Sequence, residues 1–116
     1  MLSDNVSDWI KDLEDEEGYI FLVDVSKSSN EMDDLYNVKT SRKEDTIAYE
    51  YLHTVEKALQ KIKEENPGMF WMHMIRKDPK QRINIYGKKD KGFDAYDSIN
   101  VDIRKIKIVR SEERSD

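Results

Sequence analysis

Three oxygen-bearing side chains stand at alternate positions close to the end of an apolar run. Asp24, Ser26 and Ser28 form the sequence D-x-S-x-S, and their carboxylate and hydroxyl oxygens are the ligands that hard cations such as Mg²⁺ prefer. A metal-dependent hydrolase centred on Asp24 is one hypothesis. The alternative is a strand that runs out into a Ser-rich, Asx-type turn, which explains the same three residues without a ligand.

The D-x-S-x-S sequence resembles the metal-ion-dependent adhesion site of von Willebrand A domains, in which an Asp and two Ser help to hold Mg²⁺. The resemblance is confined to this short segment and implies a doubly wound parallel sheet, which needs many more residues than the 116 of this chain. Residues 30–34 also lack the helical pattern that should follow at once. We therefore predict no metal and no cofactor, and the hydrolase is the least favoured hypothesis.

The two histidines do not suggest a catalytic pair. His53 falls opposite the apolar stripe of a predicted helix, and His73 falls in a predicted strand between Met72 and Met74. No Ser or Cys is placed in the sequence to act with either one as a nucleophile. The four glycines are scattered instead of gathered in a phosphate-binding loop. The sequence thus predicts a protein that is not an enzyme.

Charge is sorted along the chain. Residues 1–65 contain seventeen acidic and eight basic residues, a net charge of −9, whereas residues 66–116 contain eight acidic and twelve basic residues, a net charge of +4. Two segments of opposite sign favour a charged macromolecular partner over a small substrate.

An acidic run lies at the C-terminus of the first predicted helix. Its carboxylates would face the negative end of the helix dipole, at a cost of about 0.3–1 kcal/mol each. Because stability does not explain that placement, we predict a docking surface for a basic partner; a solvated turn that keeps the protein soluble is the alternative. The residues are Asp12, Glu14, Asp15, Glu16 and Glu17.

A basic run surrounds two predicted hairpin connections, and aromatic residues that could stack on bases follow it. A nucleic-acid-binding domain that uses residues 76–93 is therefore the alternative function, although lysines that guard sheet edges against aggregation explain the same run. Tyr49 is added as a binding anchor because it lies off the apolar stripe of its predicted helix. The other predicted binding residues are Lys88, Lys89, Lys91, Phe93 and Tyr96.

Two helices are predicted, over residues 4–16 and 42–65. In the first, apolar side chains recur at the spacing of one helical face; they are Val6, Trp9, Ile10 and Leu13. In the second, Ser41 and Glu44 have the capping-box spacing at the start, and residues 66–68 stop the helix. The apolar stripe between them consists of Ile47, Tyr51, Val55, Ala58, Leu59 and Ile62.

Apolar, β-branched and aromatic segments predict the strands, which are residues 19–25, 35–38, 69–75, 83–86 and 98–109. Residues 26–34 are a predicted polar loop, and residues 78–80 and 87–92 are predicted turns. A β-bulge is predicted near Arg104 and Lys105, because the isoleucines on the two sides of that point have opposite parity.

The element order α, β, (β), α, β, β, β predicts an α+β fold, in which two helices pack on an antiparallel sheet of four to five strands. Residues 1–110 are expected to form a single domain, and residues 111–116 a frayed, charged tail.

These patterns predict a small acidic, non-enzymatic binding protein that inhibits or modulates a macromolecular partner by surface occupation. Immunity proteins, antitoxins and phage anti-defence or host-takeover proteins are of this type. The expected partner is a protein with a charged surface, nucleic acid is the alternative partner, and self-association through a sheet edge is a further alternative. No apolar run reaches the roughly 20 residues of a membrane helix, and the absence of cysteine fits a cytoplasmic location.

Overall fold

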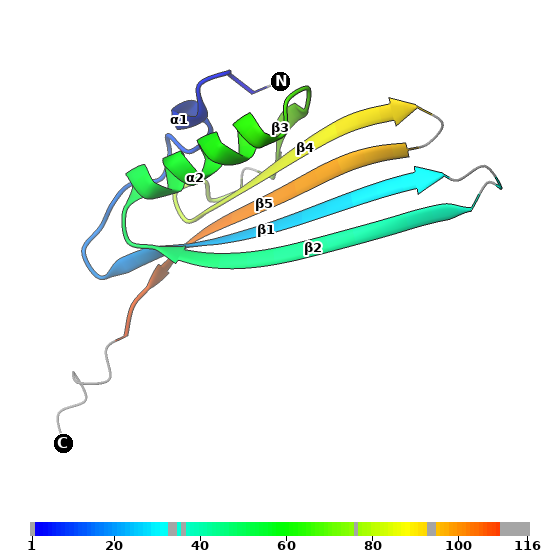
Figure 1. Ribbon diagram of the computed structural model, residues 1–116. Coiled ribbons are helices and arrows are strands. Elements are labelled where there is room, and N and C mark those ends of the chain that lie inside the picture. The colour runs from blue at the N-terminus through cyan, green and yellow to red at the C-terminus, as the bar shows by residue number, and fades with distance from the viewer. Residues whose placement is uncertain (1, 33–34, 36, 76, 93–94, 110–116) are drawn as a thin grey trace.

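The computed structural model describes residues 2–32, 35, 37–75, 77–92 and 95–109. Its elements are α1 (Val6–Trp9), β1 (Tyr19–Met32), β2 (Val38–Tyr49), α2 (Leu52–Glu65), β3 (Phe70–Ile75), β4 (Arg82–Gly92) and β5 (Ala95–Lys107). Both helices lie on the same face of one five-stranded sheet (Figure 1). The structure thus has the predicted α+β class, with an antiparallel sheet and two helices.

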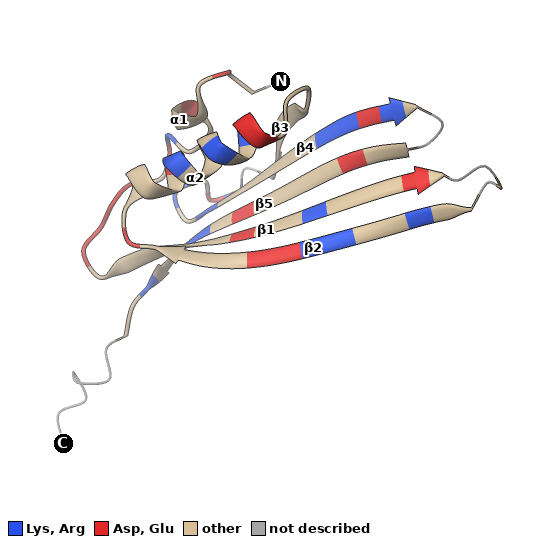
Figure 2. Cartoon of the chain, in the orientation of Figure 1, with Lys and Arg blue, Asp and Glu red and all other residues tan. Residues whose placement is uncertain are grey.

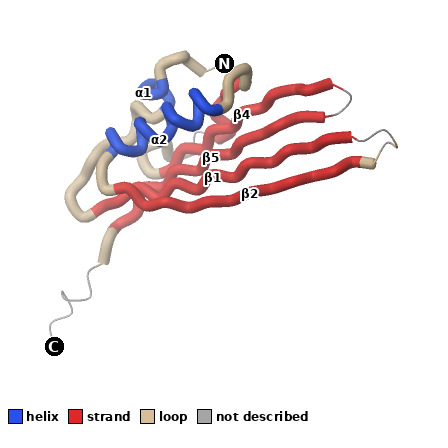
Figure 3. The backbone as a smooth tube through the Cα atoms, viewed as in Figure 1, coloured by secondary structure: helices blue, strands red, loops and turns tan. Residues whose placement is uncertain are grey.

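The five strands are antiparallel and lie in the order β2-β1-β5-β4-β3. The last three strands along the chain form a meander, and β5 lies beside β1, which forms a long hairpin with β2 (Figure 3). This order makes β2 and β3 the two edge strands. Among the described residues, neither α1 nor α2 has the length and apolar composition of a membrane-spanning helix.

The core lies between the helices and one face of the sheet. Alternate residues of each strand point to that face, so the buried strand residues are Phe21, Val23, Trp71, Ile83, Ile85, Ile99, Val101 and Ile103. The segment around α1 contributes its apolar residues, and α2 contributes Val55 and Leu59. Each fully buried side chain of this size stabilises the fold by roughly 1.5–3 kcal/mol.

The helices cover one end of the sheet and leave the other end free on both faces (Figure 1). With 14 residues, α2 is about 21 Å long, whereas the 14 residues of β1 extend over about 46 Å. Beyond the helix, polar side chains link neighbouring strands. Ser29 Oγ donates to Asp97 Oδ1 over 2.7 Å, and Thr40 Oγ1 donates to Asn30 Oδ1 over 2.7 Å.

The prediction of a polar loop over residues 26–34 is wrong, because β1 continues to Met32. The apolar composition of residues 19–25 marks only the part of β1 that lies in or beside the core. From Ser26 onward the strand depends on ladder hydrogen bonds with two neighbours and on the polar cross-strand bonds just described. Residues 33, 34 and 36 lie outside the described part of the chain.

The predicted helix over residues 42–65 is wrong in its first third. Residues 38–49 form β2, and α2 begins at Leu52. In place of a helix, an unbroken ladder of twelve residue pairs joins this segment to β1. Ser41 and Glu44 therefore lie in a strand and form no capping box. The stripe from Val55 to Ile62 does face the sheet.

The first helix is also shorter than the predicted residues 4–16. It ends at Trp9, and Asn5 is its N-cap, with the Asn5 side chain accepting from the Ser7 amide. The apolar positions of the pattern are all buried as expected, because a turn that follows the helix keeps Ile10 and Leu13 in the core. Leu13 N donates to Ile10 O over 3.0 Å in this turn.

The predicted β-bulge near Arg104 and Lys105 is wrong. These residues pair with Leu22 and Phe21 without a shift of register, so Ile106 lies on the face opposite the helices, 36% exposed. The described strands shift register elsewhere, between His73 and Ile75 and between Asp90 and Gly92.

The predicted strand 35–38 is wrong, because Leu35 lies in a turn and β2 begins only at Val38. The remaining predicted elements agree with the structure in part. Strand 69–75 is found as β3, and strands 83–86 and 98–109 lie within or largely within β4 and β5, which are longer. A turn forms at residues 78–80, where Asp78 has a φ of 53°. The predicted turn at 87–92 is instead the end of β4. The predicted tail, residues 111–116, lies outside the described part.

Candidate binding groove at the open sheet edge

The two edges of the sheet differ in their surroundings. At β3, Leu2 N donates to Trp71 O over 3.1 Å, and the side chain of His73 bonds to Trp9 O over 2.9 Å. The N-terminal segment thus covers part of that edge. At the other edge, eleven of the twelve residues of β2 are exposed, and no described segment forms a backbone hydrogen bond to its outer side. The edge at β2 is open along its described length.

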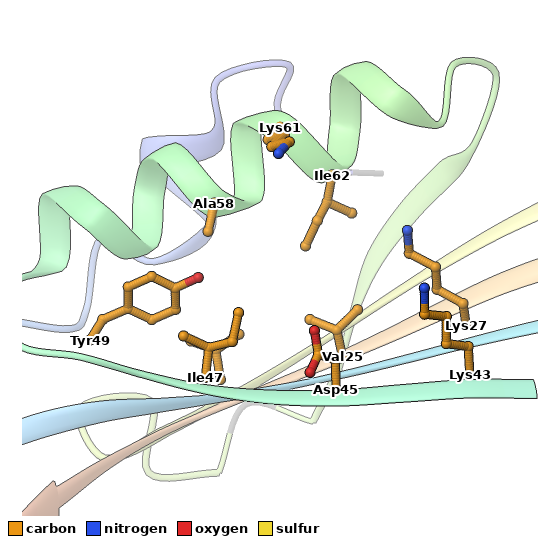
Figure 4. A pocket seen from close by; sticks show the side chains of 10 residues that line it. Val25, Lys27, Lys43, Asp45, Ile47, Tyr49, Ala58, Lys61 and Ile62 are labelled. Atoms are coloured by element: carbon orange, nitrogen blue, oxygen red, sulfur yellow. The ribbon is translucent and has the colours of Figure 1, made fainter.

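A groove of about 260 Å³ lies beside this open edge, between α2 and the strands β1 and β2. Figure 4 shows Ile47 and Tyr49 on the strand side facing Ala58 and Ile62 of the helix. The apolar lining is completed by Val23 and Val25. We call this site the α2–β2 groove. Ile47 is 47% exposed, so the groove presents apolar surface to solvent next to unpaired strand backbone.

Lysines gather at one end of the α2–β2 groove. Lys27 and Lys43 face each other as direct cross-strand partners, and Lys61 of α2 also lines the groove (Figure 4). Like charges directly opposite each other destabilise a sheet by some tenths of a kcal/mol. Among the described residues, neither Lys27 nor Lys43 has an ion-pair partner, and Lys61 lies 3.9 Å from Glu65 of the same helix. This end of the groove is therefore suited to an anionic group.

Tyr49 lies in the groove, half-buried, and not on an exposed helical face as its predicted role as anchor assumed. Burial raises the pKa of its hydroxyl, and the nearby carboxylate of Asp45 raises it further. The phenol therefore stays protonated at neutral pH and can donate a hydrogen bond to a ligand in the groove.

The acidic run has a different setting from the predicted one. Because α1 ends at Trp9, Asp12 to Glu17 lie in the connection to β1 and not at a helix C-terminus. Asp15 Oδ1 accepts from Leu52 N over 2.7 Å, so this carboxylate caps α2, whose own N-cap residue makes no side-chain bond. A carboxylate at a helix N-terminus is favourable, which reverses the sign of the predicted dipole effect.

A second member of the acidic run also makes an intramolecular contact. Glu16 lies 3.6 Å from the ammonium group of Lys105, whose side chain is 7% exposed. Asp12 has an interaction within the fold as well. At least three of the five acidic residues thus contact other parts of the chain.

The basic residues of β4 are also paired within the sheet. Lys88 lies 3.6 Å from Asp90 and 5.1 Å from the centre of the Tyr96 ring. Lys91 lies 3.0 Å from Asp97 and 3.3 Å from Glu31. Basic residues from the second half of the sequence thus lie beside acidic residues in the fold, so the two segments of opposite charge do not stay separate. Figure 2 shows acidic and basic residues on the same strands.

The Lys91 cluster shifts two pKa values. Hydrogen bonds from Ser29 and then from Lys91 lower the pKa of Asp97. The bond to Asp97 is the main reason that the pKa of Lys91 is raised. The remaining lysine of this run, Lys89, packs its side chain near Gly68. Phe93 lies outside the described part of the chain.

The D-x-S-x-S residues lie in the middle of β1, on the face away from the helices. Asp24 accepts a hydrogen bond from Thr46 and lies 3.3 Å from Arg104, while Ser26 accepts from Arg42 over 3.3 Å. The described residues include no cluster of three or more His, Asp or Glu that could hold a metal ion. His53 stacks on Tyr51, with ring centres 5.7 Å apart, and takes no part in the contact that His73 makes at the other edge.

The sequence does not predict the α2–β2 groove, because residues 42–50 have the apolar spacing of a helix although they form a strand for most of their length. Comparison with known proteins gives no further guide: no family model matches the chain, and no curated protein or solved structure matches it.

Proposed function

We propose that this protein is a non-enzymatic binding protein that holds a protein partner at the open β2 edge and the α2–β2 groove, and inhibits or modulates that partner by occupying its surface. The observation that carries the proposal is the contiguity of the two features. A twelve-residue edge strand with free backbone groups runs along a groove with exposed apolar surface. Proteins usually cover such edges or pair them.

The chemistry of the titratable side chains supports a binding role. The groups that a hydrolase would use are held in structural contacts: His73 bonds to Trp9 O, and Asp24 bonds to Thr46 and pairs with Arg104. The lysines of the groove, by contrast, have no such contacts within the described chain apart from the pair that Lys61 forms with Glu65. Charged groups left unpaired beside apolar surface are typical of recognition sites.

A protein partner is favoured over nucleic acid. The basic residues that would hold phosphates, Lys88 and Lys91, are paired with carboxylates, and a phosphate would have to displace these. The net charge of −5 also weakens binding to a polyanion. Nucleic-acid binding by residues 76–93 remains the alternative function that the test must separate.

The test is a capture experiment with matched variants. The immobilised protein is incubated with lysate of its source organism, and bound proteins are compared between the native chain and Ile47→Ser or Lys43→Glu. Each variant has a control outside the groove: Ile106→Ser on the opposite face and Lys57→Glu on α2. We expect a partner retained by the native chain and both controls and lost by both groove variants, with weaker capture as salt rises.

Two results would contradict the proposal. Partners that survive both groove variants would place the binding site elsewhere. Retardation of a single-stranded oligonucleotide at low salt, abolished when Lys88, Lys89 and Lys91 are changed to Glu, would favour the nucleic-acid alternative, particularly if the lysate yields no protein.

A further inference from the structure

The dimensions of the α2–β2 groove limit what can occupy it. A volume of about 260 Å³ accepts one or two side chains, whereas a whole helix is about 10 Å across. The neighbouring edge offers backbone groups to an extended chain over the twelve residues of β2. Side-chain pockets beside a free strand edge are the features by which sheets bind extended peptides as an added strand.

The charges on β2 specify the chemistry of such a strand. On the helix side, an added strand would present every second residue, opposite Ile47, Asp45 and Lys43 in turn. The matching side chains are an apolar residue, a basic or hydroxyl residue and an acidic residue at positions i, i+2 and i+4. The acidic side chain would meet Lys43 at the end of the groove where Lys27 also lies (Figure 4).

We infer that the partner contributes an extended segment that adds to β2 as a sixth strand, with an apolar side chain in the α2–β2 groove and a carboxylate, four residues away, at Lys27 and Lys43. This inference rests on the proposed function and names the kind of segment that is bound. It explains why two lysines are direct cross-strand partners although this arrangement costs stability. An acidic ligand between them would offset that repulsion.

A second copy of this chain is a poorer occupant than an acidic segment. Pairing of β2 with β2 of a second copy would be two-fold symmetric, so the central residue would face its own copy. A register centred on Lys43 would set Lys43 against Lys43 and Ile47 against Lys39. A register centred on Glu44 would set Lys43 against Asp45 of the copy but Ile47 against Ser41, so neither register brings an apolar side chain to the groove.

The first experiment uses a labelled peptide of Ser and Thr with isoleucine and glutamate four positions apart and lysine midway. Its binding is measured by fluorescence anisotropy to the native chain, to Lys43→Glu and to the control Lys57→Glu. We expect saturable binding to the native chain and the control, weakened about tenfold in Lys43→Glu. A peptide with lysine in place of glutamate should show the opposite preference. Equal binding of both peptides to the native chain would overturn the acidic assignment.

The second experiment tests strand addition itself. An added strand bonds to β2 through the amides of alternate residues only. Two peptides are therefore compared, one N-methylated at the odd-numbered positions and the other at the even-numbered positions. We expect one set of methyl groups to abolish binding and the other to leave the affinity within about twofold. Equal effects of the two sets would overturn strand addition. Decanoate, a fatty acid with an apolar chain and a carboxylate, tests whether the groove accepts a small ligand instead. Binding of decanoate without binding of any peptide at millimolar concentration would also overturn strand addition.

Results that contradict the acidic segment can be distinguished from results that contradict the proposed function. Peptides that bind at β2 without regard to charge would leave the proposed function standing and remove the acidic segment. A captured partner that survives both groove variants would instead remove the proposed function, whatever the peptides do.

Discussion

Trp71 lies directly over the backbone of Gly87, its cross-strand partner on β4. A Cβ atom built at Gly87 would be 2.6 Å from Cε3 and Cζ3 of the Trp71 ring, closer than non-bonded carbon atoms approach each other. Trp71 in turn contacts Trp9, with ring centres 5.3 Å apart. Gly87 is thus required for the space it leaves, and it places this indole pair between the edge strand β3 and the segment around α1.

Gly87→Ala should destabilise the fold by about 1–3 kcal/mol, because a well-packed core does not absorb an added methyl group without shifts. Urea unfolding measures the change. In a double-mutant cycle with Trp71→Leu, most of the cost should disappear, since the ring that the methyl group meets is gone. Equal costs in both backgrounds would show that the Trp71 ring is not the cause.

Asp15→Ala should lower the free energy of unfolding by about 0.5–2 kcal/mol, the usual range for a lost helix N-cap. The carboxylate caps α2 from 37 residues away, so its loss exposes an unsatisfied amide in the first turn. Glu14→Ala and Glu17→Ala, which remove neighbouring charges of the acidic run, are the controls and should change stability by less than about 0.5 kcal/mol. Equal effects at all three positions would indicate a general charge effect.

Asp97→Asn should cost about 0.5 kcal/mol at neutral pH, as expected for a partly exposed ion pair. Because the folded state lowers the pKa of Asp97, the carboxylate stabilises the fold above the ordinary pKa of 3.8, and this contribution is lost as pH falls through the lower folded value. The stabilities of the native chain and of the Asp97→Asn variant should therefore converge only at a pH below 3.8. Asp90→Asn, at a more exposed carboxylate, should show a smaller difference at neutral pH.

Lys43→Glu should raise stability by about 0.2–1 kcal/mol, because it replaces a like-charge cross-strand pair with an opposite-charge pair. The gain should shrink in 1 M salt, where the Debye length is about 3 Å, and Lys43→Gln should give an intermediate value. Under our proposal the same change weakens partner binding. A loss of stability would mean that Lys27 and Lys43 do not repel each other in the folded chain.

The fold class could be predicted from the sequence because the core residues carry their own pattern. The run from Tyr19 to Val23 and the isoleucines of β4 and β5 are apolar enough to mark strands, and Val55 and Leu59 mark the core face of α2. These are also the places where burial provides most of the stabilisation.

The free half of the sheet could not be predicted in the same way. Its strands contain Ser, Asn, Lys and Thr on both faces, so alternation of apolar and polar residues is absent there. What holds it together is pairing between segments far apart in the chain, such as Ser29 with Asp97. The start of α2 could not be predicted for the same reason. Its cap is Asp15, which is distant in the sequence, so no local capping motif indicates where the helix begins.

The candidate groove depends on that missed pairing. Ile47 was assigned to a helical stripe, and it does face α2, but from the neighbouring strand. Lys27 and Lys43 come together only because β1 and β2 form a hairpin in this register. The enrichment of β-branched residues between Val38 and Ile47 was the available indication of a strand, and the helical spacing of the same segment competed with it.

The unequal edges of the sheet bear on the stoichiometry of the proposed complex. Leu2 bonds to Trp71 and covers part of the edge at β3, so β2 is the edge that is open along its described length. Under our proposal one partner segment is therefore expected for each copy of this chain.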